Sequence, residues 1–253
     1  MSAVTTAHSS PDSPAVSANR AVYWLSQHWL LLFSVLWGIY VGLPWLAPIF
    51  MKIGWTSAGN ALYLIYSTQC HQMPQRSFFL FGSKPMYSLA EIQAAWRVTD
   101  NPAILRMYMG DPVMGWKVAW SDRMVSMYTS IFFGGLLYGL VRRRLKPLSI
   151  WGFGPLVSPM VLDGVTHAMS DLAGIGNGFR DSNAWLATLT NRTFSAAFYS
   201  GDALGSFNSD MRLITGVLFG IGVVWFAYPY LQEALAGAEL KIHDKFERAG
   251  RSL

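Results

Sequence analysis

Long runs without a charged residue alternate with short charged clusters along this chain of 253 residues. The uncharged runs cover residues 21–51, 53–75, 124–141, 147–162 and 213–232. Because a helix needs roughly 17 to 25 apolar residues to cross the hydrocarbon core, several of these runs are long enough to span a bilayer. The pattern predicts an all-α fold, a polytopic bundle of transmembrane helices with about five membrane segments.

The five expected segments lie at about 24–50, 58–72, 125–141, 147–169 and 211–231. The second segment is short, so we interpret it as a partly buried or re-entrant helix. Tryptophans at positions 24, 29, 37 and 45 of the first segment fit aromatic anchors at the membrane interfaces. Two segments carry glycines four positions apart, a spacing that lets helices pack closely in lipid; the pairs are Gly135 with Gly139 and Gly216 with Gly220.

The remaining residues form a long loop and two tails. In the loop at 73–123, "SLAE" at 88–91 is a capping box, and "TDNPAILRMYMG" at 99–110 places Pro102 in a first helical turn and Gly110 at its end. We expect both short helices to lie on the membrane surface. Residues 1–20 predict a disordered tail because they are rich in Ser, Ala, Pro and Thr. Residues 236–253 predict a basic cytoplasmic tail.

Composition and charge further narrow the class of protein and its partners. The chain is 52% hydrophobic and 13% charged, with a formal net charge of +5. The basic residues form no stripe interleaved with aromatics, which argues against nucleic acid as a partner. Their densest group lies between two apolar segments and comprises Arg142, Arg143, Arg144 and Lys146. This positive-inside pattern predicts a multi-pass protein of the cell's inner (plasma) membrane, a cytoplasmic C-terminus, and anionic lipid headgroups as partners.

This topology brings unusual polar residues to one outer face of the bundle. We expect a polar junction there, made of Gln72, Arg76, Asp122, Arg123, Asp163, Arg180, Asn183, Asp210 and Arg212. Ionisable groups at membrane depth mark a site or a buried pair. The four arginines are suited to gripping an anionic headgroup. The alternative is internal pairing with Asp122, Asp163, Asp181 and Asp210, which the near balance of charge favours.

Three residues are minority candidates for catalysis: Cys70, His71 and His167. Cys70 is the only cysteine, so no internal disulfide is possible. Adjacent helical residues do not face each other, so the base for a Cys70 thiolate would be His167 rather than His71. Asp163, His167 and Asp171 repeat every four residues and are minority candidates for a metal site. We favour a structural His167 bonded to a carboxylate or carbonyl, and a Cys70 that is a small buried hydrophobe.

Four stretches resemble a prokaryotic family of integral membrane proteins, the domain of unknown function 2085. They are "CHQMPQRSFFLFG" at 70–82, "SDRMVSMY" at 121–128, "PMVLDGVTH" at 159–167 and "NSDMRLITGVLFG" at 208–220. The resemblance implies a membrane fold but no established activity. The family pattern also has C-x-R-C at the helix after the first stretch, where this chain has Ser121, Asp122, Arg123 and Met124. A cysteine metal or redox site implied by the family therefore cannot form here.

Two functions remain open from the sequence. The first is a structural or accessory subunit of a membrane complex, with membrane lipids and other subunits as partners. The second is an interfacial membrane enzyme, or a protein that handles a lipid or isoprenoid, with its site at the polar outer face. The sequence leaves the presence of a cofactor undetermined, and it leans away from an enzyme because no complete catalytic set is present. A transporter lacks support, since no inverted repeat is visible.

Overall fold

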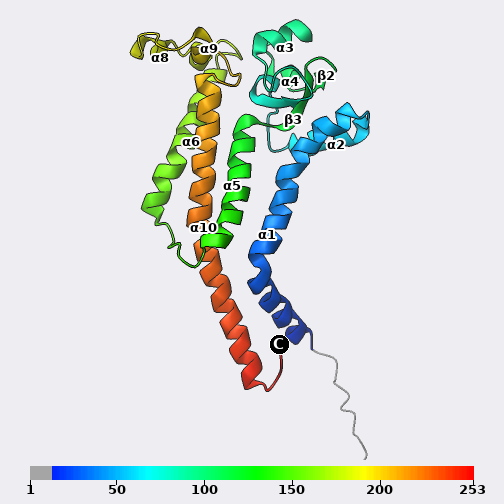
Figure 1. Cartoon of the computed structure of the whole chain (residues 1–253), viewed down its shortest axis with the longest axis vertical. Coiled ribbons are helices and arrows are strands. Elements are labelled where there is room, and N and C mark those ends of the chain that lie inside the picture. Colours follow the sequence, from blue (N-terminus) through cyan, green and yellow to red (C-terminus); the bar gives the residue numbers. More distant parts are fainter. Residues whose placement is uncertain (1–12) are drawn as a thin grey trace, which may run out of the picture.

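The computed structural model describes residues 13–253, and in it four long helices lie side by side beneath a folded cap (Figure 1). The helices are α1 (Pro14–Lys52), α5 (Asp122–Val141), α6 (Ile150–Asp171) and α10 (Phe207–Arg248). Helix α10 contacts each of the other three. We call residues 53–121 and 172–206 the cap; both of these segments lie at the same end of the bundle.

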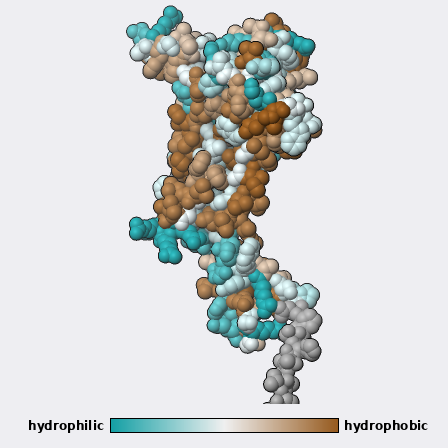
Figure 2. All heavy atoms as spheres, turned by 45° about the vertical axis from the view of Figure 1, so that its right-hand side comes forward, coloured by the Kyte–Doolittle hydropathy of each residue, from teal (hydrophilic) through white to brown (hydrophobic). Residues whose placement is uncertain are grey.

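Three helices within residues 13–253 are long and apolar enough to cross a membrane: α1, α5 and α10. At a rise of 1.5 Å per residue, α5 is about 30 Å long, which matches a hydrocarbon core of about 30 Å. Helices α1 and α10, with 39 and 42 residues, are longer than this core. On the face drawn in Figure 2, hydrophobic side chains form a belt across the middle of the molecule, with hydrophilic surface below it and a mixed surface above it.

The expected number of about five membrane segments is therefore not confirmed. The second expected segment forms only α2 (Thr56–Tyr66), whose 11 residues are too short to cross the core. The fourth forms α6, which has 22 residues but is not among the three candidate spans. Helix α6 buries polar residues near its end, and these lower its average hydropathy; they are Asp163, His167 and Ser170.

The cap contains a small antiparallel sheet, so the all-α expectation was wrong for this part. Its strands are β1 (Ser77–Leu80), β2 (Gly110–Asp111) and β3 (Gly115–Ser121), in the order β1-β3-β2. Ser77 pairs with Ser121, so β1 brings the chain that follows α2 against the start of α5. A Cβ at Gly82 would overlap the backbone of Met114, which is why the turn after β1 needs a glycine.

Short helices fill the rest of the cap. The predicted capping box is confirmed at α3 (Leu89–Ala95), where Ser88 and Glu91 bond each other's backbone. Asn101 caps α4 (Pro102–Leu105), but this helix ends before Gly110, which begins β2 instead of stopping a helix. The other pieces are η1 (Pro74–Arg76), α7 (Phe179–Ser182), α8 (Ala184–Leu189) and α9 (Ala196–Tyr199).

The described parts of both expected tails are largely helical. Helix α1 begins at Pro14, so the predicted disorder is wrong from there to residue 20, while residues 1–12 lie outside the described part of the chain. Helix α10 continues to Arg248 through most of the expected C-terminal tail. The two helix ends support each other beyond the hydrophobic belt: Gln27 Nε2 donates to Glu239 Oε1 at 3.0 Å, and Trp29 Nε1 to Gln232 Oε1 at 3.1 Å.

The spaced glycines of α10 determine how closely α5 approaches. A Cβ at Gly216 would overlap the Oγ of Ser126, and one at Gly220 would overlap the Oγ of Ser130. The backbones of α5 and α10 can come this near because the glycines have no side chain, as the small-residue spacing predicted. This packing brings the first turns of both helices together directly under the cap.

Candidate functional site

Four arginines and four aspartates form a network of ion pairs where the cap meets the helices. The arginines are Arg76, Arg123, Arg180 and Arg212, and the aspartates are Asp122, Asp163, Asp171 and Asp202. We call these eight residues the junction. They come from η1, α5, α6, α7, the loop after α9, and α10, so the junction joins both parts of the cap to three long helices.

Arg212 lies at the centre of the junction. Its Nε donates to Asp122 Oδ1 at 2.7 Å, and its Nη1 donates to Asp202 Oδ1 at 2.6 Å. Its Nη2 donates to the backbone oxygen of Asp202 at 2.7 Å. Asp122 is also bonded by the hydroxyl of Ser209 at 3.1 Å. All three guanidinium nitrogens are thus satisfied, as burial of a charge requires.

Arg76 holds the second group of contacts. Its Nη1 and Nη2 grip both carboxylate oxygens of Asp171 at 2.7 Å each, and its Nε donates to Asp202 Oδ2 at 2.7 Å. Asp202 therefore lies between the guanidinium groups of Arg76 and Arg212. Burial alone would raise the pKa of Asp202, but these two cations hold it well below its usual range. The carboxylate stays ionised and links the loop before α10 to η1.

Asp163 holds the third group of contacts. Its Oδ2 lies 2.6 Å from Arg123 Nη2, and its Oδ1 lies 2.8 Å from Arg180 Nη2. Arg180 also donates from Nη1 to Thr166 Oγ1 at 2.7 Å and from Nε to Asn208 Oδ1 at 3.1 Å. Asp163 is thus a bridge on α6 between an arginine of α5 and an arginine of α7.

His167 lies between these groups. Its Nδ1 is 3.7 Å from Asp163 Oδ1, and its Nε2 is 3.4 Å from Asp202 Oδ1. Arg123 Nη2 and Arg212 Nη1 lie 3.3 Å from the same two ring nitrogens. Each ring nitrogen therefore has one possible donor and one possible acceptor beside it. The ring connects two carboxylates that are otherwise held by different arginines.

A cavity of about 320 Å³ opens on one side of the junction, and we call it the arginine cavity. Its charged and titratable lining consists of Arg76, Arg123, Arg212, Asp171, His71, His167 and Cys70. Arg76 and Arg212 are fully buried in their ion pairs, whereas the Arg123 side chain is 22% exposed. The Nε of Arg123 has no hydrogen-bond partner within the described residues. Arg123 is therefore the arginine with donor capacity left for an anion.

A second cavity of about 580 Å³ lies between α6, α10 and the segment from α7 to α8, and we call it the apolar cavity. Its apolar lining is Pro159, Leu162, Phe179, Trp185, Phe207 and Met211. Three polar residues of the wall belong to or touch the junction: Asp163, Thr166 and Arg180. Because Asp163 pairs with both Arg180 and Arg123, it connects the walls of the two cavities.

The three candidate catalytic residues do not form a catalytic set. Cys70 is buried, and its Sγ lies 3.4 Å from the backbone nitrogens of Gln72 and Ser121. No described histidine bonds to this sulfur. His71 instead accepts from the backbone nitrogen of Met73 at its Nδ1, at 3.1 Å. Desolvation and the nearby Arg76 charge both lower the pKa of His71, which favours the neutral ring.

Three other predicted junction residues lie nearby but outside the ion-pair network. Gln72 donates to the backbone oxygens of Tyr63 and Ala119, so it ties α2 to β3. Asn183 donates to the backbone oxygens of Arg180 and Tyr199 and orders the loop around α7. Asp210 is half-buried and has no ion pair within residues 13–253.

The expected pairing of charges was half right. Asp122 and Asp163 do pair with arginines, but Asp181 instead accepts from the backbone nitrogen of Gly178 at 2.8 Å. The places expected for Asp181 and Asp210 are taken by Asp171 and Asp202. Helix α10 is capped by Ser206, whose hydroxyl accepts from the backbone nitrogen of Ser209.

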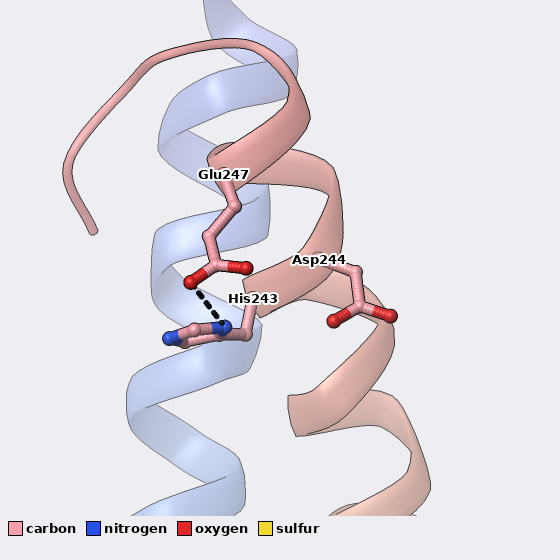
Figure 3. Close-up of side chains that lie close together, drawn as sticks. All are labelled: His243, Asp244 and Glu247. Carbon is pink, nitrogen blue, oxygen red and sulfur yellow. Dashed lines mark ion pairs between the residues drawn. The ribbon is translucent and has the colours of Figure 1, made fainter.

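The proposed metal ligands do not converge. Asp163 and Asp171 are occupied by different arginines, and neither offers a free carboxylate to a cation beside His167. Among the described residues, the acidic and histidine side chains that do cluster are His243, Asp244 and Glu247, within 4.8 Å of one another (Figure 3). They are exposed near the end of α10, far from the junction, where neighbouring helical residues of this kind are common without a metal.

Two important residues escaped the sequence reasoning. Asp202 lies in a glycine-flanked loop without helical periodicity, so no pattern points to it. Lys117 is fully buried in β3, where its Nζ donates to the backbone oxygens of Gln72 and Arg106 at 2.8 and 2.7 Å. Burial lowers the pKa of Lys117 to about 7. The burial of Lys117 depends on the folded cap around it, so the sequence alone does not predict it.

Comparison with known proteins agrees with the resemblance stated above. The profile of a family described as a predicted membrane protein (DUF2085) matches residues 112–226. An uncharacterized protein of Methanocaldococcus jannaschii is 25% identical over 197 residues, which cover 75% of this chain and 84% of the relative. No solved structure matches. The matched range holds most of the junction, including Arg123, Asp163 and Arg212, while Cys70 and Arg76 precede it.

Proposed function

We propose that this membrane protein binds an anionic amphiphile, of the lipid or isoprenoid class, at the junction. The apolar cavity takes part of the hydrocarbon chain, and the headgroup lies against the arginines. The proposal rests on the position of the apolar cavity. Asp163 and Arg180 form part of its wall. Asp163 is also ion-paired to Arg123, which lines the arginine cavity. An apolar pocket with a few converging polar groups is the usual form of a ligand site.

The size and the charge of the two cavities support this assignment. A volume of about 580 Å³ lies within the range of ligand pockets, roughly 300 to 1,000 Å³. Each methylene group buried there contributes roughly 0.8 kcal/mol. In the arginine cavity, Arg76 and Arg212 are held by aspartates, so the partly exposed Arg123 is the cation that faces an incoming anion. Guanidinium groups bind phosphate or carboxylate groups through paired hydrogen bonds.

Binding, rather than catalysis, is the role that these residues support. No described histidine bonds to the thiol of Cys70, and the His71 Nδ1 is already engaged by a backbone N–H. The interpretation as a structural or accessory subunit stays a prediction. Its support is the belt of exposed apolar side chains, and lipid alone covers such a belt equally well.

The test is to identify amphiphiles that remain bound after purification in mild detergent, by native mass spectrometry. Leu162→Trp fills the apolar cavity, and Val161→Trp adds the same side chain at the neighbouring exposed position, which does not line the cavity. We expect the first variant to lose the bound amphiphile and the second to retain it. Equal retention by both variants would contradict the proposal. Co-migration of all variants with one fixed set of other membrane proteins would favour the accessory subunit instead.

A further inference from the structure

Two adjoining cavities lie at the opposite end of the membrane segments from the junction. One, of about 450 Å³, is lined entirely by polar or charged residues: Ser26, Gln27, Arg142, Arg143, Gln232 and Glu239. The other, of about 330 Å³, is lined mostly by apolar residues and glycines of α1 and α5. Gln27 and Arg142 belong to both linings, so the polar cavity continues into the apolar one.

The depth of this pair of cavities matches the edge of a bilayer. Helix α5 ends at Val141 after 20 residues, so Arg142 and Arg143 follow directly at the level of the headgroups. Figure 2 shows hydrophilic surface immediately below the hydrophobic belt. The cavity of about 330 Å³ reaches back into the belt along Leu30, Leu31 and Leu136. A molecule that fits both cavities therefore has a polar head at Arg142 and a hydrocarbon chain between α1 and α5.

The charge of the polar cavity determines what kind of head it accepts. Arg142 and Arg143 form no ion pair within the described residues. Glu239 is the acidic residue of the lining, and one of its oxygens accepts from Gln27 Nε2 at 3.0 Å. Two cations against one anion leave a formal charge of +1 on the lining. Arg142 and Arg143 therefore have donors available for a phosphate group, and the adjoining amide side chains add further polar contacts.

Gly139 of α5 packs closely against α1 beside this groove. A Cβ at Gly139 would lie 3.3 Å from Leu30 Cδ2, which is tighter than ordinary packing. A Cβ at Gly135 would instead meet the ring of Tyr228 in α10 at 3.1 Å. From the continuous lining, the unpaired arginines and the depth, we infer that this groove binds one anionic phospholipid, with its phosphate at Arg142 and Arg143 and one acyl chain along α5. This site is independent of the one proposed at the junction.

The turn between α5 and α6 provides a matched control. Arg142→Gln with Arg143→Gln removes two charges from the cavity, whereas Arg144→Gln with Lys146→Gln removes two charges from the same turn outside it. The probe is phosphatidylglycerol titrated into the full-length protein in detergent, with bound lipid counted by native mass spectrometry. We expect binding about 30-fold weaker in the first pair, since each basic residue near an anionic lipid contributes about 1 kcal/mol. The second pair leaves the lining of the cavity unchanged, so we expect it to weaken binding much less than the first pair does.

A second pair of variants tests the chain groove without changing charge. Leu136→Trp fills the groove, and Leu137→Trp adds the same bulk at an exposed position outside it. We expect the first to abolish retention of phosphatidylglycerol and the second to preserve it. A competition experiment with inorganic phosphate distinguishes a lipid site from a site for a free anion. Phosphate at the same concentration as phosphatidylglycerol should not displace the lipid. Equal losses in both charge variants, or full displacement by phosphate, would overturn the inference.

Discussion

Arg212 of α10 and Asp122 of α5 form an ion pair at 2.7 Å, with side chains that are 2% and 0% exposed. Ninety positions of sequence separate them, and their pairing joins the first turns of two membrane helices. The glycines of α10 make the same approach possible one and two turns further along. The junction therefore begins where helix packing forces two opposite charges together, and the cap then supplies the remaining partners.

Asp122→Asn should strongly destabilise the protein. The substitution leaves Arg212 buried next to a neutral amide, and breaking a buried pair costs roughly 3 to 5 kcal/mol. Thermal unfolding in detergent measures the loss. Asp210→Asn is the control. Asp210 lies beside Arg212 in the first turn of α10 and is half-buried, but it has no ion pair in the described chain. Similar effects of the two substitutions would show that the buried pair does not stabilise the fold.

Asp202 should make stability depend on acid pH. The pKa of Asp202 is lowered in the folded protein, so its contribution is present above the unfolded value of about 3.9 and is lost as pH falls through the folded value. We expect the midpoint of unfolding to fall on acidification below about pH 4. Asp202→Asn should be less stable at pH 7 and should lose part of this acid dependence. An unchanged acid profile in the variant would contradict the assignment.

Lys117 should make stability rise with pH in the same direction, but between neutral and alkaline pH. Its folded pKa of about 7 lies below the unfolded value, so between the two values the unfolded chain binds more protons and stability rises with pH. The neutral amine still has two N–H groups for the oxygens of Gln72 and Arg106. We expect unfolding midpoints to increase from pH 7 to pH 10 in the native protein. Lys117→Met should be less stable overall and lack this increase; a persisting increase would exclude Lys117 as its source.

Gly216→Ala should weaken the packing of α5 on α10. The added Cβ overlaps the Oγ of Ser126, and overpacking of this kind costs roughly 1 to 3 kcal/mol. Ser126→Ala in the same protein removes the overlapping hydroxyl and should restore part of the loss. Gly42→Ala in α1 is the matched control, since nothing lies within 4 Å of a Cβ there. A double variant no more stable than Gly216→Ala would place the strain elsewhere.

Sequence patterns predicted those features whose physical cause lies within a short stretch of the chain. The lengths of the apolar runs predicted α1, α5 and α10, because the hydrocarbon core sets a minimum length for any span. The capping box at Ser88 and Glu91 was predictable because its hydrogen bonds join residues three positions apart. The expected number of about five segments is not confirmed, since a run of uncharged residues does not reveal that α2 ends after 11 residues.

The sequence by itself determined a membrane protein whose polar residues meet at one end of its helices. Tertiary structure decided which of them pair. Asp171 and Asp202 complete the junction in place of Asp181 and Asp210, although all four were equally visible as aspartates. The difference arises because β1 pairs with β3, about 40 positions away, and carries Arg76 toward α6. Such long-range hydrogen bonds and buried charge pairs form only when distant segments are brought together, and no local pattern records them.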